Sequence, residues 1–235
     1  MDFDPTANRL LAALDSADFA LLESRLGRVS LRQGQVLQQQ EELVERVYFP
    51  LEGVISLVSV MASGEVVETA TIGREGTLGA FGGLGQWRAF SRASVQIPGT
   101  AAAMTVDSFQ LAASQSVGLR NLILRYKEAQ LAQVQQTAAC NALHDLEQRL
   151  ARWLLQLLDR VDNDVLPLTQ EVIAQMLGVR RSSVTDVAGA IQKRGLIRYH
   201  RGRIDVTDRA GLEEAACECY RAIHRRTEAV FGVRT

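Results

Sequence analysis

The sequence predicts an α+β protein built from an N-terminal jelly-roll β-barrel, a long dimerisation helix and a C-terminal winged helix-turn-helix. Three observations predict this order of parts. Short alternations of apolar and polar residues, separated by glycines, fill residues 28–105. From Ser108 to Val161 proline is absent, only Gly118 remains among the glycines, and helix formers dominate. A helix-turn-helix pattern then occupies residues 168–197.

The barrel region contains candidate strands at residues 29–31, 47–49, 54–60, 66–72 and 93–97. Glycines such as Gly53 and Gly99 are interpreted as turn residues between strands, and Met61–Glu65 is a candidate hairpin turn. Two short helices are expected within residues 8–26, with Asp15 or Ser16 as the cap of the second.

A long helix is expected from Leu119 to about Asn141. Its seam has spacings of three and four with one gap at Gln133, and consists of Leu119, Leu122, Tyr126, Ala129, Gln136, Cys140 and Leu143. This spacing is close to a heptad and predicts a two-fold dimer through the helix. The alternative is a single amphipathic helix that uses the same residues in the core. A break is expected near Asp145, where the next part of the chain begins.

The segment from Leu168 to Ile197 predicts two short helices joined by a tight turn. Thr169 can cap the first helix, and Gly178 supplies the turn. The second helix is expected from about Arg181 to Lys193, with apolar residues facing inward. Polar and charged residues begin it on the outward side, where a helix placed in a major groove reads bases. The pattern therefore names double-stranded DNA as a partner.

Residues 196–207 predict a wing, because two short strand patterns flank a turn at Gly202. Between Pro167 and Arg209 there are eight basic and four acidic residues, about +4, whereas the whole chain is formally −1. Local positive charge is what phosphate binding requires, so Arg180, Lys193, Arg201 and Arg203 are candidate DNA-backbone contacts. The alternative is a winged helix that contacts another protein.

The composition excludes several classes of protein. The chain has 235 residues, of which 47% are hydrophobic and 23% charged, as expected of a globular protein of one or two domains. No run of ~18 apolar residues and no secretory signal is found, so no membrane partner is expected and the predicted location is the cytoplasm. No nucleophile elbow, phosphate-binding loop or dinucleotide fingerprint occurs, so the chain is not expected to be an enzyme.

The cysteines and histidines give no metal prediction. Cys140, Cys217 and Cys219 form no disulfide framework. A single terminal helix is expected over residues 208–231, which would place Cys217 and Cys219 on different faces. A Cys-x-Cys redox or metal pair is the alternative. The histidines, at positions 144, 200 and 224, are scattered without metal-ligand spacing.

The order of these parts resembles the Crp–Fnr superfamily of bacterial transcription regulators. Three segments carry the resemblance, Tyr48–Ser56, Asp145–Ala151 and Leu177–Val184, and it covers nearly the whole chain. It implies a cyclic-nucleotide-binding-like sensor domain at 1–117, a dimerisation helix at 118–144 and a DNA-binding domain at 145–235. It also implies a homodimeric, sequence-specific regulator that binds an inverted repeat, with RNA polymerase as a candidate partner. The competing interpretation is a small-molecule-sensing interaction protein.

The resemblance also assigns DNA contacts. The family's base-reading positions match Arg181, Ser182 and Asp186, and backbone-phosphate positions match Thr169, Gln170 and Ser183. Only Arg181 keeps the family's residue type, and it could pair with a guanine through two hydrogen bonds. Ser182 and Asp186 replace glutamate and arginine, so the operator is expected to differ.

The sensor half departs further from the family's pattern. A candidate effector pocket consists of residues that match the family's ligand-binding motif or could supply a cation. They are Arg74, Gly76, Thr77, Ser91, Arg92, Ala93, Val134 and Gln135. Thr77 stands where a ribose-binding carboxylate is expected, and Arg92 is one place from the usual phosphate arginine. Neither Val134 nor Gln135 offers the hydroxyl that would contact adenine. Cyclic AMP is therefore not the expected effector; another small ligand or none remains.

The cofactor, if any, is left open by the sequence. The oxygen-sensing branch of the family holds an iron–sulfur cluster with cysteines near the N-terminus. Cys140 is the first cysteine here, so that mechanism is set aside. Haem stays an option because its ligands vary, although the barrel region contains no histidine.

Overall fold

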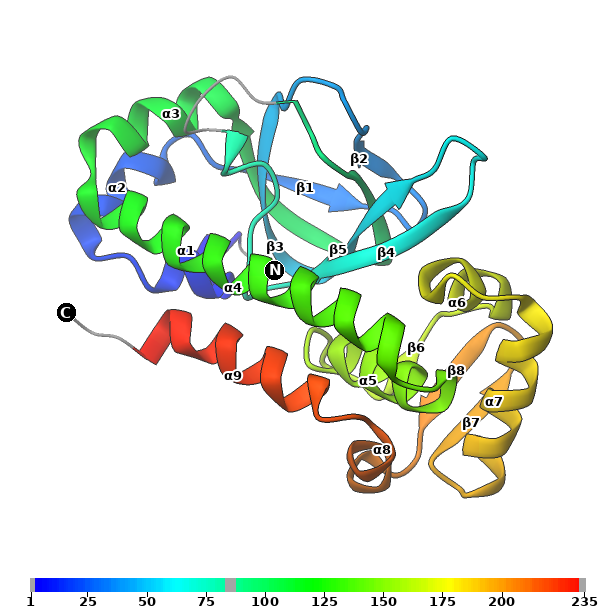
Figure 1. Cartoon of the computed structure of the whole chain (residues 1–235). Coiled ribbons are helices and arrows are strands. Elements are labelled where there is room, and N and C mark those ends of the chain that lie inside the picture. The colour runs from blue at the N-terminus through cyan, green and yellow to red at the C-terminus, as the bar shows by residue number, and fades with distance from the viewer. Residues whose placement is uncertain (1–2, 83–87, 233–235) are drawn as a thin grey trace.

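The computed structural model describes residues 3–82 and 88–232. A β-domain and a winged domain are connected by the long helix α4 (Val117–Leu143), which runs across the molecule (Figure 1). The last helix, α9 (Cys219–Gly232), lies beside α4 and returns the chain toward the N-terminal helices (Figure 1). In the part of the chain that is described, no helix is both long and apolar enough to span a bilayer.

The β-domain is a curled antiparallel sheet. Its strands are β1 (Gly27–Leu31), β2 (Val36–Gln38), β3 (Arg46–Val60), β4 (Val66–Ile72) and β5 (Arg92–Thr105). Their order is β1-β5-β3-β4, and β2 pairs with β5. The Met61–Glu65 hairpin turn is confirmed, since Met61 N–H donates to the Glu65 carbonyl at 2.9 Å.

Two predicted strands, 47–49 and 54–60, are one continuous strand, β3, so the interpretation of Gly53 and Gly99 as strand-ending turns is wrong. The pairing of β3 with β5 shifts register around Gly53, whose φ is +84°. A Cβ at Gly53 would lie 2.6 Å from the Ile97 carbonyl oxygen, and one at Gly99 2.2 Å from the Glu52 carbonyl oxygen. The glycines therefore allow a bulge where two backbones approach, and they bend the sheet without ending it.

Helices close one end of the barrel. They are the 3-10 turn η1 (Pro5–Ala7), α1 (Arg9–Ala12), α2 (Ser16–Glu23) and α3 (Val106–Gln115). Asp15 caps α2 by accepting from Asp18 N–H at 2.8 Å. Leu11, Leu22 and Phe109 from these helices pack with Phe49 of β3 and Ile123 of α4, and this cluster fixes α4 against the barrel.

α4 begins after its cap Ser116 and has two different faces. Most of the predicted dimer seam, including Leu119, Leu122, Tyr126 and Cys140, is buried within the chain. The assignment of this seam to a dimer is therefore wrong, and the alternative of a core stripe describes it. The reason is that a stripe with spacings of three and four has the same pattern whether it meets the protein's own core or a second chain.

The winged domain begins with α5 (Leu146–Leu158), which Asp145 caps as expected at the break. It continues with β6 (Val165–Leu166), α6 (Gln170–Leu177), α7 (Arg181–Lys193), β7 (Ile197–His200), β8 (Arg203–Val206) and α8 (Arg209–Ala215). The predicted single helix over 208–231 is wrong, because a short non-helical segment separates α8 from α9. Val54, Val58 and Ile97 of the barrel share one core cluster with α5 and α6, so the two domains pack directly together.

Candidate nucleic-acid interface and sensor cavity

The helix-turn-helix has the geometry that the sequence predicts. Thr169 caps α6, because its Oγ1 accepts from Val172 N–H at 3.2 Å, and Gly178 ends the helix in a left-handed conformation. On α7, Val184 and Ile191 are fully buried against the domain core. The opposite side of the same helix remains open to solvent. The first turn of α7 therefore presents polar side chains on a rigid support.

The wing meets the start of α6. Arg201 and Gly202 both have positive φ, +48° and +77°, which closes the two-residue turn between β7 and β8. A Cβ at Gly202 would lie 3.3 Å from Thr169 Cγ2, so the wing tip contacts the α6 cap. The Thr185 hydroxyl of α7 donates to Gln170 Oε1 at 2.9 Å. Three separate elements thus form one surface.

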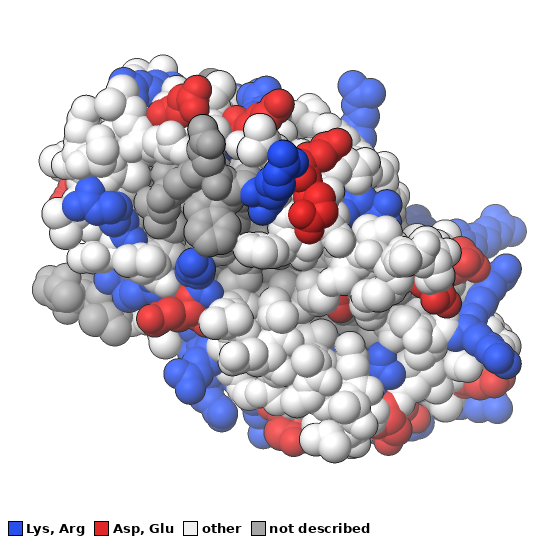
Figure 2. All heavy atoms as spheres, turned by 45° about the horizontal axis from the view of Figure 1, so that its top comes forward, with Lys and Arg blue, Asp and Glu red and all other residues white. Residues whose placement is uncertain are grey.

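This surface contains the predicted DNA-contact residues. Gln170 and Ser183 are half-buried, and the others are exposed: Thr169, Arg180, Arg181, Ser182, Asp186, Lys193, Arg201 and Arg203. Lys and Arg side chains gather along the edge of the molecule that carries α6 and α7, with a few acidic residues among them (Figure 2). Two cations of the segment are engaged within the protein, since Arg194 pairs with Glu147 and Arg209 with Asp159.

A cavity of about 500 Å³ lies between the barrel and α4. Its wall is mostly apolar, with Leu57, Ile72, Phe81 and Leu131 among the lining residues. Concave, largely apolar cavities with a few polar groups are typical of small-molecule sites. The cavity is therefore a candidate small-molecule site.

The cavity brings together only part of the predicted effector pocket. Thr77, Ser91 and Val134 line it. The Thr77 hydroxyl donates to the Tyr48 carbonyl at 2.9 Å, so its proton is already used. Two cationic residues outside the predicted pocket, Arg88 and Lys127, also line it. One face of α4 carries the cavity-lining residues Lys127, Gln130, Leu131 and Val134. Their spacing of three and four residues is the sequence pattern from which this shared face could have been predicted.

The other predicted pocket residues lie outside this cavity, so their assignment is corrected. Gly76 packs against Tyr126, whose hydroxyl oxygen would be 2.2 Å from an added Cβ. Ala93 is buried in the barrel core. The neighbouring Arg92 lies on β5, opposite Val58 of β3 in the strand register. Gln135 lines a different hollow, between α4 and α9. Local sequence matching fails here because the register of the strand and of the helix face decides which side chains point inward.

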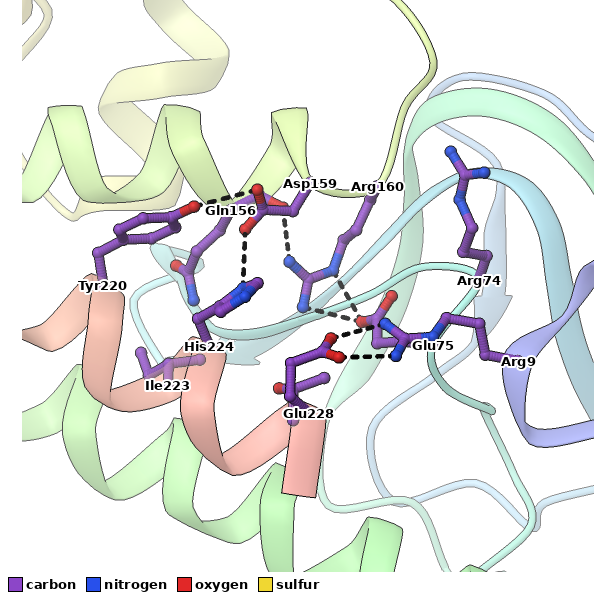
Figure 3. Close-up of a pocket in the computed structure, with 11 residues that line it drawn as sticks. Arg9, Arg74, Glu75, Gln156, Asp159, Arg160, Tyr220, Ile223, His224 and Glu228 are labelled. Carbon is purple, nitrogen blue, oxygen red and sulfur yellow. Dashed lines mark hydrogen bonds and ion pairs between the residues drawn. The ribbon is translucent and has the colours of Figure 1, made fainter. Parts of the chain in front are cut away.

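Arg74 also lies elsewhere, in a charged cluster between the domains (Figure 3). Its guanidinium pairs with Asp162. Beside it, Arg160 and Glu75 form a buried ion pair of 2.8 Å, which joins the segment just after α5 to the barrel domain. Arg9 of α1 holds Glu228 of α9 through two hydrogen bonds, of 2.7 and 2.9 Å. No local sequence pattern predicts this cluster, because its members are far apart along the chain.

The cysteines and one histidine converge, contrary to the expectation from their spacing. The helix is interrupted between α8 and α9, and this interruption turns Cys217 and Cys219 toward the same point. Cys140 and His144 of α4 also meet there. The four potential ligand atoms all lie within 4.8 Å of one another. These residues could hold a metal ion.

The fold and its surfaces place the protein in one class. A barrel with a ligand-sized cavity is connected by a long helix to a winged helix, whose helix-turn-helix and wing expose basic side chains. Residues 28–116 match the family model of the cyclic nucleotide-binding domain, and residues 148–215 match the Crp-like helix-turn-helix domain. The chain therefore belongs to the Crp–Fnr family of transcriptional regulators.

Individual relatives are distant. The chain is 27% identical over 180 residues to a global nitrogen regulator of Synechococcus elongatus, covering 72% of this chain and 81% of that protein. A crp/fnr-family regulator from Eubacterium rectale has a structure with a TM-score of 0.70 at 16% identity, covering 89% of this chain and 98% of that one. FixK2 from Bradyrhizobium japonicum also gives 0.70 at 16% identity, with 82% and 98% covered. At such identities the structures establish the fold alone.

Proposed function

We propose that the chain is a homodimeric regulator that reads an inverted DNA repeat with α7 and holds phosphates with the wing and the start of α6. The observation that carries this proposal is the division of α7: its inner side is buried, while Arg181, Ser182 and Asp186 are exposed at its N-terminal end. Residues at this end meet base edges when such a helix lies in a major groove.

Dimerisation is assigned to the outer face of α4. Val117, Leu124 and Leu131 are exposed at intervals of seven residues, and Ala138 continues the row. Side chains seven apart form one stripe along a helix, as in a two-stranded coiled coil. Leu131 also lines the sensor cavity, so a partner helix on this stripe would lie beside bound ligand.

The effector is proposed to be a small molecule other than cyclic AMP. A cyclic phosphate requires a cation and N–H donors, and ribose recognition requires an acceptor. Arg92 is not part of the cavity wall, and Thr77 supplies a hydroxyl in place of a carboxylate. The apolar wall with Arg88 and Lys127 suits a ligand with a largely apolar body and an anionic group.

The test is selection of bound duplexes from a random pool by the purified chain, with and without a small-molecule extract. We expect an inverted repeat whose half-sites are about one helical turn, ~34 Å, apart. Binding should fall steeply with salt, because phosphate contacts release counterions. If no duplex is enriched and retention does not depend on salt, the proposal fails, and the alternative of a winged helix that contacts another protein takes its place.

A further inference from the structure

A compact cluster at the junction of the two domains consists of Cys140, His144, Cys217 and Cys219. Cys140 and His144 are one turn apart at the end of α4, and the other two flank the start of α9. The three cysteines are at most 4% exposed. The Sγ atoms of Cys140 and Cys217 are 3.5 Å apart, and Cys219 Sγ lies 3.6 Å from His144 Nδ1.

These distances match those around a tetrahedral ion. Zinc–sulfur bonds of about 2.3 Å place two thiolates of one ion about 3.8 Å apart. The pairs at 3.5 and 3.6 Å are already near that separation, and the whole set lies within 4.8 Å. Only small side-chain movements are needed to enclose a metal.

A second observation concerns the other nitrogen of His144. Its Nε2 lies 3.3 Å from the Glu218 carboxylate, while Nδ1 is directed at the thiols. Histidines that bind metal commonly donate the remaining N–H to a carboxylate, which fixes the tautomer and strengthens the ligand. Glu218 occupies that outer position here.

A buried cation lies beside the cluster. The Arg152 side chain is 2% exposed and its Nε has no hydrogen-bond partner within the described structure. Arg152 interacts electrostatically with Cys140, one of the four clustered residues. Three thiolates and a neutral imidazole around a divalent ion leave one negative charge, which Arg152 can offset.

Burial of the thiols as small apolar groups is the alternative explanation. It accounts for three cysteines in a core. It does not account for an imidazole nitrogen aimed at a thiol, a carboxylate behind that imidazole, or a buried arginine beside the set.

We propose that Cys140, His144, Cys217 and Cys219 bind one zinc-like divalent ion, which fastens the end of α4 to the start of α9. On binding, the thiols that are still protonated release their protons to solvent, and four metal–ligand bonds form without any oxidation. The α5 helix of the winged domain begins two residues after His144, so the ion fixes the point at which the two domains join.

Cobalt titration of the reduced, chelator-treated full chain tests this. We expect one Co²⁺ per chain, with the visible bands of a tetrahedral ion and a near-ultraviolet thiolate-to-cobalt band that zinc abolishes. Cys140→Ser and Cys217→Ser should lose the site, while circular dichroism and DNA binding report whether each variant still folds. His200→Ala, which removes a histidine outside the cluster, should retain it.

Glu218→Gln gives a subtler test that leaves all four ligands in place. Loss of an outer carboxylate typically weakens metal affinity about 10- to 100-fold. The matched control Glu214→Gln, three positions from Cys217 on the exposed side of α8, should bind as the unchanged chain does. Zinc should also raise the melting temperature of the unchanged chain and not that of Cys217→Ser.

Two results would overturn the proposal. One is the absence of a thiolate-to-cobalt band in the reduced, folded chain. The other is a Cys140–Cys217 disulfide in chain whose thiols were alkylated at the moment of cell lysis, which would indicate a redox pair in place of a metal site. Three alkylated cysteines released only after chelation would support the metal.

Discussion

Arg181 and Val184 are three residues apart on α7 and meet opposite environments. Arg181 is exposed at the first position of the helix, whereas Val184 is fully buried. The apolar side chain holds the helix in place, and the guanidinium extends outward from a fixed base. A rigid support keeps the entropy lost on binding small, so the arginine can contribute to selectivity.

Replacement of Arg181 by alanine should remove selectivity at one position of each half-site. A bidentate arginine–guanine contact contributes about 1–3 kcal/mol of discrimination, so specific affinity should fall while scrambled DNA is bound nearly as before. The measurement is titration of both duplexes across a salt series. An unchanged ratio of specific to scrambled affinity would show that the register of α7 is assigned wrongly.

Arg203→Ala is the matched comparison at the wing. Arg203 is exposed beside the Arg201–Gly202 turn, at the wing tip that the proposed function places against DNA phosphates. Its loss should weaken binding to specific and scrambled duplexes alike and flatten the salt slope by about one unit per half-site. A selective loss on the specific duplex would instead make the wing a base reader.

Glu68 of β4 gives a pH-dependent prediction. It is 6% exposed and accepts hydrogen bonds from the Ser56 hydroxyl and from Trp153 Nε1 of α5. Burial raises its pKa from 4.5 to about 7. Between these values the folded chain keeps a proton that the unfolded chain releases, so the stability from this group is greatest below pH 4.5 and declines up to about pH 7.

Glu68→Gln should remove that decline, which amounts to at most about 3 kcal/mol. Urea unfolding at several pH values between ~5 and ~8 measures it as the difference between variant and unchanged chain. Glu65→Gln in the exposed hairpin turn is the control and should follow the unchanged chain. Parallel curves for Glu68→Gln and the unchanged chain would contradict the buried proton.

Among the secondary-structure elements, α4 carries two apolar stripes that lie in different environments. Its inner stripe packs on the barrel and α9, and its outer row of Val117, Leu124 and Leu131 is left exposed. The sequence correctly predicts the helix and its near-heptad seam. It cannot say which stripe meets the chain's own core, because that depends on the angle at which α4 approaches the barrel.

Leu124→Glu should convert the proposed dimer to a monomer at micromolar concentration, because it places a charge in the row of residues assigned to the partner helix. Sedimentation measures this. Leu111→Glu is the matched control, since Leu111 on α3 is 46% exposed and Leu124 is 47% exposed. A dimer that survives Leu124→Glu, or an unchanged chain that is monomeric even on DNA, would contradict the assignment.

The elements that carry their own signals could be predicted. Asp145, Thr169 and Gly178 lie at helix ends in the structure as the sequence indicates, because caps depend on neighbouring backbone groups. Elements set by distant contacts could not be predicted. Gly53 belongs inside one long strand because β5 approaches it, and the break before α9 places thiols beside α4.

At the scale of the whole molecule, the charged cluster of Figure 3 joins the barrel, α5 and α9. Arg160 and Glu75 are buried, with side chains 6% and 8% exposed. Removal of one partner from such a pair leaves an unpaired buried charge. The pair is therefore placed to hold the two domains in one arrangement.

Arg160→Met should lower the free energy of unfolding by about 3–5 kcal/mol, because it leaves the Glu75 carboxylate unpaired. Asp162→Asn is the control: Asp162 is 76% exposed, and a surface pair contributes about 0–1 kcal/mol. Chemical denaturation measures both. If the two variants lose similar stability, the buried pair does not fasten the domains.

The amino-acid sequence was enough to predict the order of barrel, long helix and winged helix, the ends of the main helices and the positive charge of the helix-turn-helix and wing. These follow from local causes: side-chain periodicity, capping and local charge. Three features depend on the packing of the folded chain: which face of α4 is buried, which residues line the cavity, and the meeting of Cys140, His144, Cys217 and Cys219 at one point. These depend on packing between segments distant in the chain, and one residue's shift in register is enough to send a side chain to the other face.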